Sequence, residues 1–175
     1  MRKSEVVKRA EQFCRENNIK DYPVKIISLC KKYNISVFEK YLPEEVSGFI
    51  VIQGENYKDY GTGRLIVVNQ SDVPSRRRFT IAHELAHYLL HRPGGDEEEL
   101  FAHRDAGQYG GMETEANIFA SNILMPKELV SEALSRLKAD VGGKPFESVK
   151  VLYIAQEFAV SRPAAEVRLR QLGEI

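Results

Sequence analysis

The segment FTIAHELAHYLLH, residues 79–91, constrains the fold of this 175-residue chain more than any other feature. Its apolar residues recur at helical spacing, and a helix is predicted from about Pro74 to His91, ended by Pro93 and the glycines after it. Three of the chain's four histidines lie in this segment. In a helix His83 and His87 share one face, so that both imidazoles can bind one metal ion at about 2.0–2.1 Å.

Glu84 follows His83 directly and therefore points about 100° around the helix from it. This position lies beside a bound ion, which suits a general base and does not suit a ligand. A zinc-type ion lowers the pKa of a bound water to about 7, and a nearby carboxylate can take the proton as the water attacks a carbonyl. The pattern indicates a metal-dependent hydrolase with Glu84 as its catalytic residue. The alternative is a polar helix without a metal.

A tetrahedral catalytic site needs a third protein ligand. One family pattern places a third histidine ten residues after the first, but that position is Pro93 here. His91 lies too far along the same helix to share the ion well. Glu113 and Glu115 are the next candidates, on a helix predicted over residues 112–124. They differ by about 200° around that helix, so at most one can face the site, and periodicity does not choose between them.

Other segments predict an α+β fold. Apolar periodicity predicts helices over residues 4–17, from near Pro23 to Lys32 or Tyr33, over 126–139, and as a pair within 146–172. Apolar runs predict strands at 34–40, 47–54 and 64–70, of which the last two form a hairpin in a small, mostly antiparallel sheet of about three strands. The predicted domains are a metallopeptidase-like domain over residues 1–140, with an active-site helix pair, and a C-terminal helical extension over 146–175 that packs on the core.

The segment between the two helices of the predicted site, residues 92–111, is polar and contains the acidic run Asp96–Glu99. Loops of this length are uncommon unless they are functional or disordered, and this one could cover the site as a lid. His103 and Tyr109 lie in it, and either of them, or His91, could donate to an oxyanion. For each of the three, a structural or surface role is favoured. The three arginines at 76–78 are expected to be solvated or paired at the surface, with the acidic run as one candidate partner.

The composition gives no sign of a nucleic acid or membrane partner, because 25 basic residues balance 25 acidic ones. Cys14 and Cys30 are far apart and form neither a disulfide framework nor a Cys-x-x-Cys site, so buried free thiols in a reducing compartment are expected. No apolar run approaches the roughly 18 residues of a membrane helix, and the charged N-terminal segment lacks the apolar core of a signal peptide. A cytoplasmic location is therefore expected.

The C-terminal segment VLYIAQEFAVSRPAAEVRLRQLG has the rhythm of a helix-turn-helix. Ser161 is predicted to cap its second helix, and Gly173 to end it. Three arginines of that helix could contact DNA phosphates: Arg162, Arg168 and Arg170. The acidic residues among them and the zero net charge argue against DNA binding. A packing module or a dock for a protein partner is favoured, and a non-catalytic or DNA-binding regulator remains the alternative function.

Two stretches together, RRRFTIAHELAHYLLH and ETEANIFASNILMP, resemble the signatures of the ImmA/IrrE family of metallo-endopeptidases, a group with the His-Glu-x-x-His motif and a gluzincin-like, zincin-type core. The resemblance extends over most of the chain. It implies that His83, His87 and Glu113 bind the metal and that Glu84 is the base. Asn117 would then be an outer partner of the ligands, one turn after Glu113. Glu115 is the alternative ligand.

The resemblance also implies a substrate, a DNA-binding repressor of the Xre helix-turn-helix type. The implied cofactor is zinc, and the ligand set does not exclude Mn²⁺. The strand at 64–69 directly precedes the metal helix. If it is a sheet edge, an extended substrate could pair with it, and an interior strand is the alternative.

Overall fold

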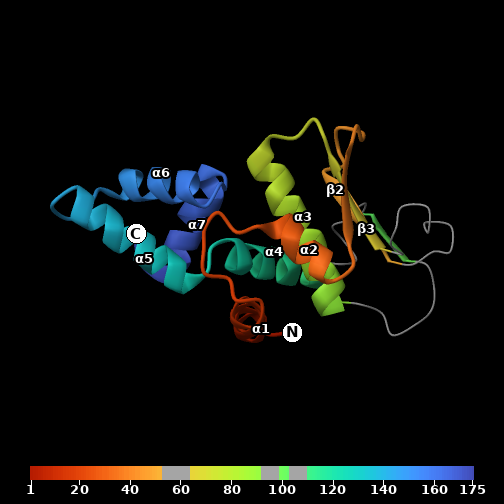
Figure 1. The fold of residues 1–175 in the computed structure, drawn as a ribbon, viewed down its shortest axis with the longest axis horizontal. Helices are drawn as coiled ribbons and strands as arrows, with labels where there is room; N and C mark the ends of the chain where they lie inside the picture. The colour runs from red at the N-terminus through yellow and green to blue at the C-terminus, as the bar shows by residue number, and fades with distance from the viewer. Residues whose placement is uncertain (53–63, 92–98, 103–109) are drawn as a thin grey trace.

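A four-stranded sheet, seven helices and the connections between them make up the described part of the chain, which in this computed structural model comprises residues 1–52, 64–91, 99–102 and 110–175 (Figure 1). The strands are β1 (Ser36–Lys40), β2 (Gly48–Ile52), β3 (Arg64–Asn69) and β4 (Glu99–Ala102). The helices are α1 (Lys3–Glu16), α2 (Ile26–Lys32), α3 (Pro74–His91), α4 (Gly110–Leu124), α5 (Lys127–Asp140), α6 (Glu147–Glu157) and α7 (Arg162–Leu172). The predicted α+β class is confirmed.

The strand order β1-β3-β2-β4 makes the sheet mixed. β2 runs antiparallel to both β3 and β4, which confirms the predicted pairing of the two central strands, and β1 runs parallel to β3. β3 is therefore an interior strand with both edges paired, and the prediction that a substrate adds to its edge is wrong. The edges of the described sheet belong to β1 and β4.

β4 is a strand that the sequence did not predict, because it lies in the segment 92–111 that was expected to be a loop. Its four residues pair with β2 in antiparallel register, from Phe49 opposite Ala102 to Ile52 opposite Glu99. Four residues that begin with the last member of an acidic run show too little alternation to predict a strand. The pairing partner, which is distant in sequence, determines the structure here.

α3 lies between the sheet and α4 (Figure 1). It packs against β2 and β3 on one side and against α4 on another, while α1 packs against α4. The main core joins the inner face of the sheet to all seven helices. None of the described helices is both long and apolar enough to cross a lipid bilayer.

The turn that leads into α3 is held by the buried side chain of Asn69 at the end of β3. Its amide nitrogen donates to the backbone carbonyls of Leu42, Pro43 and Val46 at 3.0–3.2 Å. Its oxygen accepts from the backbone N–H of Ser71 at 3.1 Å. Because a buried amide must be hydrogen-bonded to offset its desolvation, this residue ties the loop after β1 to the start of the helix.

The three arginines at the start of α3 all have partners on neighbouring elements. Arg76 donates to Ser47 Oγ at 2.8 Å and pairs with Asp72. Arg77 donates to the carbonyl of Gln70 and lies 3.6 Å from a Glu39 oxygen. Arg78 donates to a backbone carbonyl of the loop before α2, that of Val24, at 2.9 Å. These contacts anchor the first turn of α3. The acidic run at residues 96–99 was a candidate partner for the three arginines, and its residues 96–98 lie outside the described residues.

The C-terminal helices α6 and α7 form the predicted helix pair. Ser161 Oγ accepts from the backbone N–H of Ala164, and Gly173 ends α7 in the left-handed conformation at φ 71°. Apolar residues of both helices belong to the main core, among them Ile154, Phe158 and Leu169. The division into domains at residues 140–146 stays a prediction.

Arg168, one of the three arginines that could have contacted DNA phosphates, is not available for such a contact. Its side chain is buried, and its Nε donates to the backbone carbonyl of Met125 at 3.0 Å. Burial also lowers its pKa below the usual value. Arg170 is exposed but pairs with Glu166 at 2.8 Å. Charge patterns in a sequence do not distinguish a buried arginine that joins two helices from a solvated one.

Gly48 lets β2 approach α3 closely. A Cβ at this position would lie 2.6 Å from Thr80 Cγ2 and 2.7 Å from the Val67 carbonyl oxygen. Both distances are far below van der Waals contact, and the second neighbour is backbone that cannot rotate away. Only glycine therefore fits at this position of β2. The helix residue that it faces, Thr80, lies about one turn before His83.

Gly48→Ala is expected to lower the free energy of unfolding by about 1–3 kcal/mol, because the added methyl overpacks the boundary between β2 and α3. Thermal unfolding followed by circular dichroism measures this. Gly143→Ala is the matched control, since a Cβ at that glycine has no atom within 4 Å. Equal melting temperatures for the two variants would contradict the close approach.

Cys14 and Cys30 are free and buried, in α1 and α2. Burial raises the pKa of each thiol from the usual 9.0 to about 12. At pH 8 each thiol is then almost entirely protonated, and the thiolate is the reactive form. The folded protein is expected to react with no equivalent of a thiol reagent such as DTNB over minutes and with two equivalents after denaturation. Fast reaction of either cysteine in the folded protein would show that it is accessible.

Candidate metal centre

The two histidines of the opening motif lie on the buried part of α3. Every residue from Thr80 to Tyr88 is buried, because the helix is covered by the sheet and by α4. His83 is 6% exposed, His87 is 1% exposed, and Glu84 between them is fully buried. Polar groups at such depth need specific partners to offset their desolvation.

α4 supplies the carboxylate that completes the group. Glu113, in the first turn of α4, places one carboxylate oxygen 3.2 Å from His83 Nε2 and the other 3.3 Å from His87 Nε2. The two Nε2 atoms lie 3.0 Å apart. Within the residues that the structure describes, these three side chains form the group of histidine and acidic residues that could hold a metal ion.

The donor atoms lie close enough together to share one small ion. Ligand atoms bound at about 2.0–2.1 Å in a tetrahedron lie about 3.3–3.4 Å from one another. The two Nε2 atoms are 3.0 Å apart, and each lies 3.2–3.3 Å from a different oxygen of Glu113. With one donor atom taken from each of the three residues, all lie within 4.8 Å of one another, so the group could hold a zinc-type ion.

Asn117 determines which nitrogen of His83 faces the group. It lies one turn after Glu113 on α4, and its Oδ1 is 2.9 Å from His83 Nδ1. With the amide oxygen as acceptor, Nδ1 carries the proton and Nε2 keeps its lone pair, which is the form that binds a metal.

Glu115 lies on another side of α4 and belongs to a different set of contacts. Its Oε2 is 2.9 Å from His91 Nε2, and its Oε1 contacts the N-terminal amino group. Burial alone would raise the pKa of this carboxyl, but the hydrogen bonds from the amino group and from His91 outweigh it and leave the pKa below its usual value. The structure thus brings Glu113, and not Glu115, to His83 and His87.

His91 contacts His87 on the side away from Glu113, because its Nδ1 lies 3.1 Å from His87 Nδ1, whereas His87 Nε2 is the atom near Glu113. His103 and Tyr109, the other candidate oxyanion donors, lie outside the described residues. The contact between His91 and Glu115 was missed in the sequence. The four-residue spacing of His87 and His91, with Glu115 opposite Glu113 on the next helix, was the available signal.

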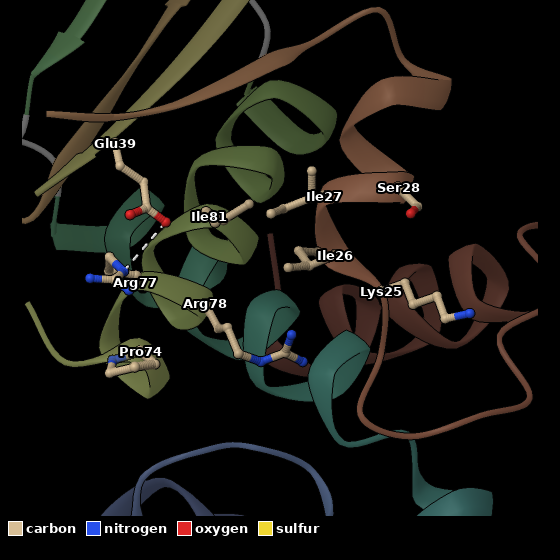
Figure 2. Close-up of a pocket in the computed structure, with 9 residues that line it drawn as sticks. All are labelled: Lys25, Ile26, Ile27, Ser28, Glu39, Pro74, Arg77, Arg78 and Ile81. Atoms are coloured by element: carbon tan, nitrogen blue, oxygen red, sulfur yellow. Dashed lines mark ion pairs between the residues drawn. The ribbon is translucent and has the colours of Figure 1, made fainter. Parts of the chain in front are cut away.

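A separate cavity of about 320 Å³ lies between α2 and the first turns of α3 (Figure 2). Figure 2 shows Arg77 pairing with Glu39, and Arg78 is another of the residues that line the cavity. None of the three residues of the candidate metal group lines it. The cavity is therefore not the candidate metal centre.

Comparison with known proteins finds one matching family, described as the IrrE N-terminal-like domain of a peptidase family, over residues 30–170. Two proteins named radiation response metalloprotease IrrE, from Deinococcus deserti and Deinococcus radiodurans, are each 38% identical over 78 residues, which is 41% of this chain. The chain spans about a quarter of these relatives, 26% and 22% of their respective lengths.

A third relative and a solved structure are also similar. The uncharacterized immunity region protein 2 of Bacillus phage phi105 is 33% identical over 108 residues, covering 59% of this chain and 60% of that protein. A structure titled Mycobacterium tuberculosis transcriptional regulator has a TM-score of 0.57 and 18% identity, covering 92% of this chain and 45% of that one. At that identity the likeness concerns the fold alone.

Glu113→Ala is expected to reduce the zinc bound per chain from about one to well below one, because two histidines alone leave the tetrahedron incomplete. Equilibrium dialysis against zinc with elemental analysis measures the change. Glu128→Ala, at an exposed glutamate in the first turn of α5, is the matched control and should bind zinc as the unmodified chain does. Full zinc binding by the Glu113 variant would exclude this residue as a ligand.

Proposed function

This chain belongs to the metallopeptidase family of the IrrE N-terminal-like domain, and on that premise we propose that it is a zinc-dependent endopeptidase that cleaves a regulatory protein. The observation that carries the proposal is the convergence of two histidine nitrogens and one carboxylate beside a fully buried glutamate. That combination provides both a metal site and a base, which peptide hydrolysis requires.

In this proposal His83, His87 and Glu113 hold the ion, and Asn117 orients His83. A bound zinc ion supplies Lewis acidity, which polarises the carbonyl of the scissile peptide and lowers the pKa of water. Two histidines and a glutamate suit zinc without excluding Mn²⁺. Three protein ligands leave the fourth position for chemistry, whereas a structural site is closed by four.

Glu84 acts as the general base and then as the general acid. As the water oxygen forms its bond to the scissile carbonyl carbon, the Glu84 carboxylate takes the proton that the water loses. As the carbon–nitrogen bond breaks, Glu84 returns that proton to the leaving amine. Its burial keeps bulk water away from the carboxylate, which strengthens electrostatic interactions at the reacting atoms.

We infer that the substrate is a DNA-binding repressor of the helix-turn-helix type. The resemblance to the ImmA/IrrE family supports this, and so does the relative named for a phage immunity region. The zero net charge of the chain is compatible with a protein partner. The peptidase would then act on gene expression by removing a repressor.

The alternatives have less support. A metal that only stabilises the fold would need a closed set of four ligands, and the group in the described residues has three. A DNA-binding role for α6 and α7 loses Arg168, which is buried. A gel-shift series at falling salt concentration tests direct DNA binding.

Glu84→Gln is expected to abolish cleavage of a helix-turn-helix repressor encoded near this chain, with a loss of at least about 10²-fold, because the amide cannot take the proton. The variant should still bind one zinc and melt at the same temperature, since glutamine has the same shape. Incubation with the purified repressor, followed by gel electrophoresis and mass spectrometry, measures the cleavage.

His83→Ala serves as the companion variant and should lose both zinc and cleavage. If the Glu84 variant cut the repressor at the rate of the unmodified chain, Glu84 would not be the base. If the unmodified, zinc-loaded chain cut no such repressor, the proposed substrate would be wrong while the metal site could stand.

A further inference from the structure

Behind His87, on the side away from Glu113, three side chains form a hydrogen-bonded chain. His87 Nδ1 lies 3.1 Å from His91 Nδ1, and His91 Nε2 lies 2.9 Å from Glu115 Oε2. All three side chains are largely withdrawn from solvent, with 2%, 7% and 13% exposure in that order. The chain connects α4 to the second histidine of the metal group through a residue one turn further along α3.

The chemistry of these groups favours one placement of the protons. An ionised carboxylate can only accept, so the proton of the last hydrogen bond is on His91 Nε2. His91 Nδ1 can then accept a proton from His87 Nδ1, 3.1 Å away. With its proton at Nδ1, His87 offers the lone pair of Nε2 to a metal ion, and this is the atom 3.3 Å from a Glu113 oxygen and 3.0 Å from His83 Nε2.

We propose that Glu115, acting through His91, holds His87 in the Nδ1-protonated tautomer and fixes its ring so that Nε2 faces the metal. His91 and Glu115 are thus positioning residues, and neither is a ligand or an oxyanion donor. The inference rests on the proposed metal site and adds a second set of supporting contacts to it. Asn117 contacts and orients His83 directly, whereas Glu115 orients His87 through His91.

The contacts of Glu115 support this role. Its two oxygens have different partners, the N-terminal amino group at Oε1 and His91 at Oε2, so the amino group does not displace the histidine. A glutamate that served only for solubility would extend into water, whereas this one is turned inward against His91. Outer partners of this kind typically raise metal affinity about 10- to 100-fold by holding ligands in place.

The test measures zinc affinity by competition with a chromophoric chelator, in the full chain and without any substrate. His91→Ala is expected to weaken zinc binding by about 10- to 100-fold. Glu115→Ala should weaken it in the same direction. The double variant should bind zinc no more weakly than His91→Ala alone, because the two residues act in series.

Two further variants separate positioning from packing. His91→Gln offers one acceptor and one donor at the end of the side chain and should recover most of the affinity that His91→Ala loses. Thr114→Ala, at an exposed residue beside Glu115 in α4, should bind zinc like the unmodified chain. Equal losses in His91→Gln and His91→Ala would overturn the tautomer role.

Nuclear magnetic resonance of the zinc-loaded chain gives a readout that a purely structural role would not move. Long-range proton–nitrogen spectra should show His87 protonated at Nδ1 with Nε2 on the zinc, and Glu115→Ala should speed the exchange of that Nδ1 proton with solvent. The opposite tautomer in the unmodified chain would overturn the inference.

The outcomes also distinguish this inference from the proposed function. If the unmodified chain failed to bind zinc, the metal site itself would be wrong. If it bound zinc and both His91→Ala and Glu115→Ala bound zinc equally tightly, only the positioning role would fall. If His91→Ala did not fold, the comparison of Glu115→Ala with Thr114→Ala would decide.

Discussion

The packing of α3 against α4 is the interaction on which the rest of the structure depends. A single straight helix cannot place three ligands around one ion, so a carboxylate from a second helix is required. Both helices carry fully buried alanines, Ala82 and Ala86 on α3 and Ala116 and Ala120 on α4, and such small side chains allow helix backbones to approach closely. That approach brings Glu113 to His83 and His87, and it also brings Asn117 to His83 Nδ1 and Glu115 to His91 Nε2. The candidate metal ligands and the side chains that contact them therefore come from the same pair of helices.

The sheet and the first turn of α3 hold this pair in place. Gly48 allows the helix to lie close on β2, and Asn69 fastens the turn before it with hydrogen bonds to three carbonyls. Arg76 to Arg78 attach its first turn to β1, to the loop before β2 and to the loop before α2. Each of these residues restricts how far α3 can move. A site that depends on ligand separations near 3 Å needs that restriction, because small displacements change how well the three atoms fit one ion.

The sequence could predict features that depend on local periodicity. The bounds of α3, its two histidines on one face and the caps of α7 follow from spacing and turn chemistry, and the structure has them. Helical periodicity also showed that Glu113 and Glu115 diverge, but it could not say which one faces α3, because that depends on how two helices rotate against each other. Strand order, β4, the burial of Arg168 and the contact between His91 and Glu115 were missed for the same reason. Each depends on a partner far away in the sequence.

The most direct measurement is anomalous X-ray diffraction from crystals of the zinc-loaded chain, recorded on both sides of the zinc absorption edge. The ion is predicted to lie at bonding distance from His83 Nε2, His87 Nε2 and one or both oxygens of Glu113. Its fourth position should be left to solvent, and Glu115 should remain on His91. An ion bound elsewhere, or one bound by His91 or Glu115 or closed off by a fourth protein ligand, would contradict a catalytic metal centre formed by α3 and α4.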